Sequence, residues 1–184
     1  GAASARAGVW VGVLGVGYPN GTTLLHYPRS VRRVYAVEPC DGAWRRARGR
    51  IERFGRPVER IGLDGAVLAL PDASVDAVVS AYTMCTIPDL QAALQEMRRV
   101  LRPGGSVHFL EHGLAPDAEV AARQHRITPR WKKVAGGCHL DRDIPALVED
   151  AGFNLSDLES FYLPGPAFAR PWGWFMIGRA EPMP

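Results

Sequence analysis

The sequence predicts an α/β domain: a doubly wound, mostly parallel sheet of seven strands, with helices on both faces and an antiparallel hairpin strand at the C-terminal end. Short apolar runs alternate along the chain with segments of helical periodicity, without an obvious linker or repeat. The first apolar run ends at a glycine-bearing turn. The last two runs are joined by a connection too short for a crossover helix, so we expect them to pair antiparallel.

Each strand is predicted from a short run rich in valine, isoleucine, leucine or aromatic residues. The run from Ser74 to Ser80 is apolar enough to be buried on both faces, as the inner strands of parallel sheets are. The predicted strands are Val9–Val16, Val34–Val37, Val58–Ile61, Ser74–Ser80, Val107–Glu111, Leu158–Leu163 and Trp174–Arg179.

The predicted helices carry apolar residues at intervals of three and four. The clearest is Asp89–Leu101, in which Asp89 can cap the start and Pro103-Gly104-Gly105 stops the helix. Residues 126–131 are expected to form either part of a lid over a bound substrate or an exposed basic loop anchored by Trp131. The other helical segments are Thr22–Tyr27, Gly42–Phe54, Ala118–His125 and Ile144–Ala151.

The segment from Val9 to Pro39 has the layout of a site for a nucleoside-containing cofactor. A strand is followed by the glycine turn 17–21, a helical segment and a second strand, and Glu38 follows about 20 residues after Gly17. The glycines let the backbone approach the ligand, and the acid accepts hydrogen bonds from ribose hydroxyls. A nicotinamide-dependent oxidoreductase is the competing interpretation, but that fold usually continues with parallel strands instead of a terminal hairpin.

Composition limits the class of protein. The 184 residues are 47% hydrophobic and 22% charged, which suits a single domain spanning residues 1–184. The net charge is +3, and the basic residues are clustered without interleaved aromatic residues, so we expect solvated helix faces and no nucleic-acid partner. Because the first strand begins so early, we expect a natural N-terminal segment to precede this sequence.

The three cysteines are an odd number without metal-type spacing. We therefore expect reduced thiols, a cytoplasmic location and no metal site. No apolar run approaches the roughly 18 residues of a membrane span, so no such span is expected. We expect a monomer or a homodimer, with Phe168 and Trp172 as candidates for either an apolar substrate pocket or a dimer contact.

Four segments resemble the class I S-adenosylmethionine-dependent methyltransferases: residues 36–39, 70–80, 96–105 and 109–112. The third is the most specific, because a helix followed by Arg-Val-Leu-Arg-Pro-Gly-Gly and a strand is typical of that family. The resemblance extends over nearly the whole chain. It implies a Rossmann-like fold, S-adenosyl-L-methionine as cofactor, and methylation of a small-molecule acceptor at a thiol, hydroxyl or amine.

Within that family, the chain resembles the group related to ubiquinone and menaquinone methyltransferases. The segment Gly136-Gly137-Cys138-His139 and residues 162–166 look like a subgroup in which some members methylate small thiols. By resemblance, the cofactor site lies at the carboxyl ends of the strands. Its residues are the glycine-loop positions Gly15, Gly17 and Gly21, the ribose site Glu38 with Pro39, the adenine site Asp64 with Gly65, and the methionine side Ala81 with Tyr82.

The glycine loop departs from the family pattern at two positions. Gly15 stands where the family carries an acid, and Pro19 stands where it carries the middle glycine. Proline cannot adopt a positive backbone angle and has no N–H to donate. These departures leave a second interpretation open, in which the chain is a catalytically impaired binding module with a weakened cofactor site.

Three residues are candidates for catalysis. Methyl transfer from a sulfonium is an in-line displacement, and an acceptor that carries a proton must also lose it. Glu111 and His112 follow the fifth strand, and His139 lies in a glycine-rich loop. Each has a structural alternative: a hydrogen-bonded pair at the strand end for Glu111 and His112, and loop stabilisation for His139. Cys85 is expected to line the pocket or pack beside it.

Overall fold

The computed structural model describes residues 11–17, 21–62 and 64–184. Two parts of the sequence predictions lie outside these residues: the first two positions of the strand Val9–Val16, and Pro19 in the glycine loop. Within the described residues, no helix combines the length and apolarity needed to cross a lipid bilayer.

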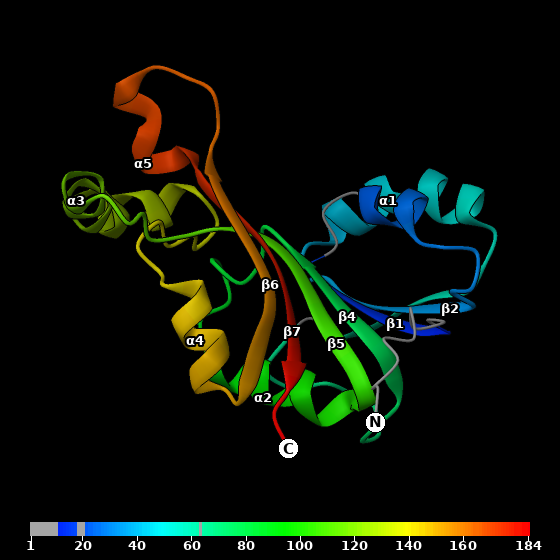
Figure 1. Cartoon of the computed structure of the whole chain (residues 1–184). Coiled ribbons are helices and arrows are strands. Elements are labelled where there is room, and N and C mark those ends of the chain that lie inside the picture. The colour runs from blue at the N-terminus through cyan, green and yellow to red at the C-terminus, as the bar shows by residue number, and fades with distance from the viewer. Residues whose placement is uncertain (1–10, 18–20, 63) are drawn as a thin grey trace.

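One sheet of seven strands runs through the molecule in the order β3-β2-β1-β4-β5-β7-β6 (Figure 1). The first five strands pair in parallel, and β7 is antiparallel to both of its neighbours. The predicted fold class is therefore confirmed, including the terminal hairpin. The strands are β1 Gly12–Val16, β2 Arg33–Val37, β3 Val58–Gly62, β4 Val75–Ala81, β5 Leu101–His112, β6 Phe153–Tyr162 and β7 Trp174–Pro182.

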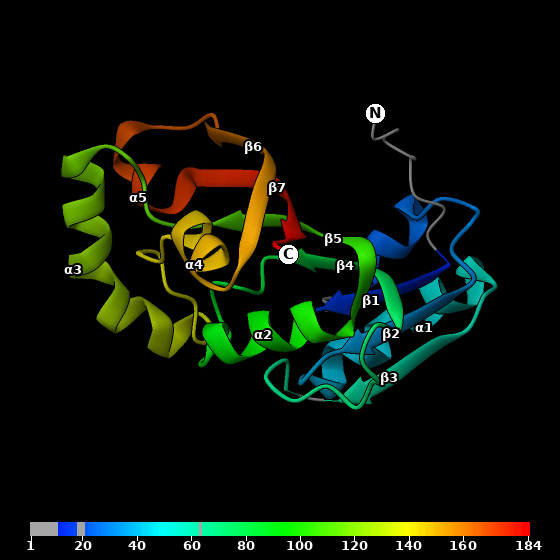
Figure 2. The same cartoon turned by 60° about the horizontal axis from the view of Figure 1, so that its bottom comes forward.

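Helices cover both faces of the sheet, with α1 on one side and α2 and α4 on the other (Figures 1 and 2). Successive side chains of β1 point to opposite faces of the sheet, so both faces are apolar and are covered by helices. Val13 packs in the buried cluster that includes residues of α1, whereas Leu14 packs in the cluster that includes residues of α2 and α4. The helices are η1 Thr22–His26, α1 Asp41–Phe54, α2 Leu90–Val100, α3 Ala118–Val134, α4 Ile144–Asp150, η2 Ala167–Ala169 and α5 Arg170–Gly173.

Helix α3 is longer than the sequence indicated. It continues past His125 to Val134 and contains Pro129, so residues 126–131 are helical and form no loop. Ile127 and Trp131 pack on a buried cluster that includes Leu140. This tertiary packing holds the helix together although proline removes one of its backbone hydrogen bonds.

Two strands also begin earlier than predicted. Strand β5 starts at Leu101, directly after α2, and pairs with β4 across a register shift between Val75 and Ala77. Strand β6 starts at Phe153, because it pairs with β7 along its whole length from Pro182 back to Trp174. Pairing with β4 extends β5, and pairing with β7 extends β6, into segments whose own composition favours turns.

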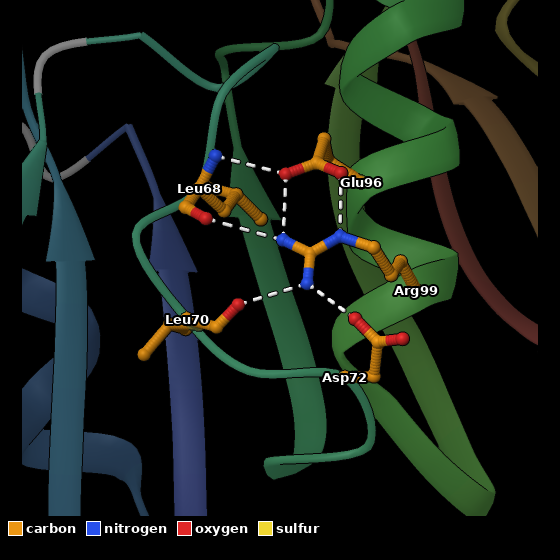
Figure 3. Close-up of polar contacts among 5 residues, drawn as sticks. All are labelled: Leu68, Leu70, Asp72, Glu96 and Arg99. Atoms are coloured by element: carbon orange, nitrogen blue, oxygen red, sulfur yellow. Dashed lines mark hydrogen bonds and ion pairs between the residues drawn. The ribbon is translucent and has the colours of Figure 1, made fainter.

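Arg99 of α2 fixes the segment between β3 and β4 (Figure 3). Its guanidinium donates to the Glu96 carboxylate at 2.6 and 2.8 Å, and to Asp72 at 2.7 Å. It also donates to the backbone carbonyls of Leu68 and Leu70, and Glu96 accepts the Leu68 N–H. Segments 70–80 and 96–105, two of the four that carry the family resemblance, are therefore in contact through the Arg99 side chain. This side chain also holds the segment around Leu68, which follows the predicted adenine site.

Asp76 stabilises the start of the central strands. Its carboxylate accepts the backbone N–H groups of Val11 and Gly12 and a hydrogen bond from Arg102, each at 2.8 Å. Burial raises the pKa of this carboxyl, but the Gly12 N–H, Arg102 and the Val11 N–H together bring the pKa below its ordinary value.

Replacing Asp76 with asparagine should destabilise the protein by about 1–2 kcal/mol near neutral pH, because these donors lose a charged acceptor. A carboxyl whose pKa is lowered by folding stabilises the fold above its unfolded pKa of 3.8, and this contribution disappears as the pH falls through the folded pKa. Urea unfolding midpoints of the two proteins should therefore converge under strongly acidic conditions. A difference that does not depend on pH would contradict this assignment.

Candidate active site

A cavity of about 460 Å³ lies at the carboxyl ends of β1, β2 and β4. This volume is within the range of roughly 300–1,000 Å³ that is usual for small-molecule sites. Ligands bind at this edge in open α/β sheets. The cavity is lined by Val16, Gly17, Val37, Pro39, Asp64, Gly65, Thr83, Thr86, Ile87, Pro88, Gly136 and Gly137.

Gly17 forms the floor of the cavity where β1 ends. Its φ is +67°, and a Cβ added there would lie 1.7 Å from Thr83 Oγ1 and 2.5 Å from the Thr83 Cβ. The Gly17 N–H donates to the Val37 carbonyl at 3.0 Å, which joins the ends of β1 and β2. Only glycine fits this position, because both its backbone conformation and its close approach to Thr83 exclude a side chain.

Glu38 lies in the turn that follows β2, between two residues that line the cavity. Only 5% of the residue is exposed, and its Oε1 accepts the Cys40 N–H at 2.7 Å. Arg60 donates to the Glu38 backbone carbonyl at 2.9 and 2.6 Å and pairs with Asp41. These hydrogen bonds hold the turn, and Pro39 lines the cavity.

Asp64 and Gly65 lie where the resemblance places the adenine. Asp64 is exposed, lines the cavity and accepts the Ala66 N–H at 2.9 Å. A Cβ on Gly65 would lie 3.5–3.6 Å from the side chains of Ile87 and Val16, so this buried glycine leaves the wall flat.

The remaining predicted cofactor residues lie elsewhere. Gly15 is buried inside β1, between Ala36 of β2 and Val79 of β4, and does not line the cavity. Gly21, Ala81 and Tyr82 line a second, smaller cavity of about 170 Å³ together with Thr22, Thr23, His26 and Leu110. Tyr82 has a φ of +55°, which is uncommon outside glycine, and its backbone N–H donates to Leu110. The structure therefore places some of the predicted residues on the larger cavity and some on the smaller one, whereas Gly15 and Glu38 line neither.

The larger cavity fits an adenosyl group. The apolar residues Val37, Pro39 and Ile87 offer surfaces for a base, and Asp64 offers an acceptor for an exocyclic amino group. Gly17 lets the ligand approach the backbone at the end of β1. Glu38 does not line the cavity itself but lies between the lining residues Val37 and Pro39, where the ribose is expected.

Glu111 is completely buried and organises the loop after β4. It accepts the Ser80 hydroxyl at 2.9 Å and the backbone N–H groups of Thr83 and Met84 at 2.9 and 3.0 Å. Burial raises the pKa of this carboxyl, although the hydrogen bonds from Thr83, Met84 and Ser80 oppose that effect. Its oxygens hold the loop that carries Thr83 and Thr86 to the cavity.

His112 does not pair with Glu111 but lies against Cys138. Its Nε2 is 3.0 Å from the Cys138 Sγ, and the Trp131 indole N–H donates to the same sulfur at 3.2 Å. A hydrogen bond between Cys85 and Cys138 raises the pKa of Cys85 and lowers that of Cys138, and His112 and Trp131 lower the latter further. His139 lies beside the same loop, where its Nδ1 and its backbone N–H both contact the Cys85 carbonyl, at 3.2 and 2.8 Å.

The grouping of Cys85, His112 and Cys138 is the part of the site that sequence reasoning missed. Their three ligand atoms lie within 4.8 Å of one another, and both cysteines are buried. The three residues follow β4, end β5 and follow α3, so they are far apart along the chain. The sequence offered one signal for part of this grouping. Cys85 follows the fourth predicted strand and His112 follows the fifth, and neighbouring parallel strands end at the same edge of a sheet.

Comparison with known proteins gives the family. Residues 14–109 match a family model described as a methyltransferase domain. The chain is 32% identical over 176 residues to the mouse protein named thiol S-methyltransferase TMT1B. The aligned region covers 92% of this chain and 70% of the mouse protein. It is 36% identical over 112 residues to the human protein of that name, covering 60% of the chain and 45% of the human protein. The chain thus spans less than half the length of the human relative.

Solved structures agree on the fold. A structure titled as a putative methyltransferase from Bacillus halodurans matches with a TM-score of 0.75 at 16% identity, covering 94% of this chain and 93% of that one. The YcgJ protein of Bacillus subtilis matches with a TM-score of 0.76 at 14% identity, covering 98% of this chain and 95% of that one. The family model covers more than half of the sequence, and the strand order, the cavity and the relatives agree with it; the chain belongs to the class I S-adenosylmethionine-dependent methyltransferases.

Proposed function

We propose that this chain transfers the methyl group of S-adenosylmethionine to the sulfur of a small thiol. The observation that carries the proposal is the cavity at the ends of β1, β2 and β4, which offers surfaces for the adenosyl group but little that could deprotonate an acceptor. The names of the mouse and human relatives, thiol S-methyltransferases, support the same acceptor class.

Acid–base chemistry favours a thiol over a hydroxyl or an amine. Of the described residues that line the cavity, Asp64 is the only carboxylate and none is a histidine. Glu111 is fully buried and already accepts several hydrogen bonds, so it is poorly placed to take a proton from an acceptor. A thiol has a pKa near 8.5 and is partly ionised at neutral pH, whereas hydroxyls and aliphatic amines need a stronger base.

The displacement itself requires positioning more than acid–base catalysis. The bound cofactor supplies an electrophilic methyl group on a positively charged sulfur. The chain's residues must hold the donor and the acceptor in line and exclude water. The loops after β1 and β4 contribute Gly17, Thr83 and Thr86 to the cavity wall. The segment after α3 contributes Gly136 and Gly137.

A matched set of acceptors tests the proposal: benzyl mercaptan, benzyl alcohol and benzylamine, each supplied with S-adenosylmethionine. We expect S-adenosylhomocysteine to form roughly tenfold faster, or more, with the thiol than with either analogue. The rate should rise with pH as the free thiol ionises. Faster turnover of the alcohol or the amine, or equal turnover of all three, would contradict the proposal.

A further inference from the structure

Three soft or borderline ligand groups converge beside the cavity. The sulfur of Cys85, the sulfur of Cys138 and a ring nitrogen of His112 all lie within 4.8 Å of one another. Cys85 lies between the cavity residues Thr83 and Thr86, and Cys138 directly follows the cavity residue Gly137. The cluster is therefore adjacent in sequence to residues that line the cavity.

The spacing suits a tetrahedral ion. Zinc binds cysteine sulfur at about 2.3 Å and histidine nitrogen at about 2.0–2.1 Å, so the ligand atoms of a tetrahedral site are roughly 3.4–3.8 Å apart. The 3.0 Å between His112 Nε2 and Cys138 Sγ and the 4.8 Å limit for the whole set bracket this separation.

The surroundings resemble those of a metal site. Trp131 donates its indole N–H to Cys138 Sγ, as second-layer donors do to metal-bound thiolates. The His112 ring is held in place by the edge of Phe175, with 5.9 Å between the ring centroids. Two charged groups face the cluster: the buried carboxylate of Glu111, and the Arg142 guanidinium, which donates to the Met84 and Pro88 carbonyls.

We propose that Cys85, His112 and Cys138 bind a thiophilic divalent cation of the zinc class. Two thiolates and one imidazole exclude calcium and magnesium, which require oxygen ligands. Two cysteines and one histidine form the kind of three-residue set that leaves a fourth position open in zinc enzymes.

Because the cluster adjoins residues that line the cavity, the acceptor would take the open position, an assignment that rests on the proposed thiol methylation. The acceptor sulfur donates a lone pair to the cation, and the proton of its S–H goes to buffer. The resulting thiolate keeps a lone pair that can attack the methyl group, and the bond between that methyl group and the cofactor sulfur breaks with its electron pair left on that sulfur.

Cobalt titration tests the metal site without the cofactor. Reduced, chelator-treated protein should bind one Co²⁺ under anaerobic conditions and develop thiolate-to-cobalt charge-transfer bands and the visible bands of a four-coordinate ion. Zn²⁺ should remove both sets of bands. C85S and C138S should each lose the charge-transfer intensity, whereas C40S, which changes the exposed third cysteine, should keep it. Weak cobalt binding without thiolate bands, or equal spectra in C138S and C40S, would overturn the site.

A second measurement needs no variant, so it does not depend on whether C85S or C138S folds. In urea just below the unfolding transition, where buried thiols become reactive, Zn²⁺ should slow the reaction of two of the three thiols with a disulfide reagent and leave that of Cys40 unchanged; equal rates with and without Zn²⁺ would overturn the site. Adding benzyl mercaptan to the cobalt protein should shift the visible bands, and an unchanged spectrum would overturn the assignment of the acceptor to the fourth position. Turnover of benzyl mercaptan by chelated protein is scored separately, so a failure of this site is distinguishable from a failure of thiol methylation.

Discussion

Replacement of Glu111 with alanine will destabilise the folded protein by about 4 kcal/mol, because several buried donors lose a charged acceptor at once. The carboxylate is fully buried and accepts the Ser80 hydroxyl and the N–H groups of Thr83 and Met84. In a protein of this size, such a loss lowers the melting temperature by roughly 10 °C, which thermal denaturation followed by circular dichroism will measure.

The matched control is Glu159→Ala, which removes an exposed carboxylate from the edge strand β6. Its melting temperature should stay within about 2 °C of the wild type, as is usual for surface substitutions. Glu111→Gln should fall between the two, because it keeps the side-chain volume but points an amide N–H₂ toward backbone donors. Equal melting temperatures for the two alanine variants would show that the loop after β4 does not depend on Glu111.

Replacement of Gly17 with alanine will abolish measurable cofactor binding. The added Cβ would overlap the Thr83 side chain, and the backbone φ of +67° adds about 1–2 kcal/mol of strain for a residue that is not glycine. The loop after β1 or the loop after β4 must then move, and both loops form walls of the cavity. Calorimetric titration with S-adenosylhomocysteine will measure the loss.

Gly49→Ala is the matched control for Gly17→Ala. Gly49 lies in helix α1, and a Cβ there meets nothing within 4 Å. Because alanine is the better helix former by about 1 kcal/mol, this variant should be slightly more stable than the wild type and bind the ligand equally well. Wild-type affinity in Gly17→Ala would show that the end of β1 is not part of the ligand site.

The sheet could be predicted from the sequence because its signals are local. Residues 75–80 of the apolar run lie in β4 and are buried or half-buried, and the terminal hairpin follows from the short connection between residues 163 and 174. Element ends were less predictable, because they depend on partners distant in sequence. Trp131 extends α3 by packing on the cluster around Leu140, and β7 extends β6 back to Phe153.

The sequence predicted those site residues that directly follow a predicted strand. Gly17, Pro39 and Asp64 all line the cavity because three parallel strands end at the same edge of the sheet. The relation between His112 and Cys138 could not be read from sequence, since it depends on where the segment after α3 returns to the sheet. Glu111 and His112 are adjacent in sequence, but successive residues of a strand point to opposite faces, so they serve different neighbours.

The proposed cofactor site depends most directly on the carboxylate of Glu38, which lies beside the cavity that fits an adenosyl group. Calorimetric titration of the wild type and of Glu38→Gln with S-adenosylhomocysteine tests it, with the exposed β3 substitution Glu59→Gln as control. We predict saturable binding to the wild type and to Glu59→Gln, and at least roughly tenfold weaker binding to Glu38→Gln, because a charged acceptor for the ribose hydroxyls is lost. Absence of saturable binding to the wild type, or equal affinity in all three proteins, would contradict the account.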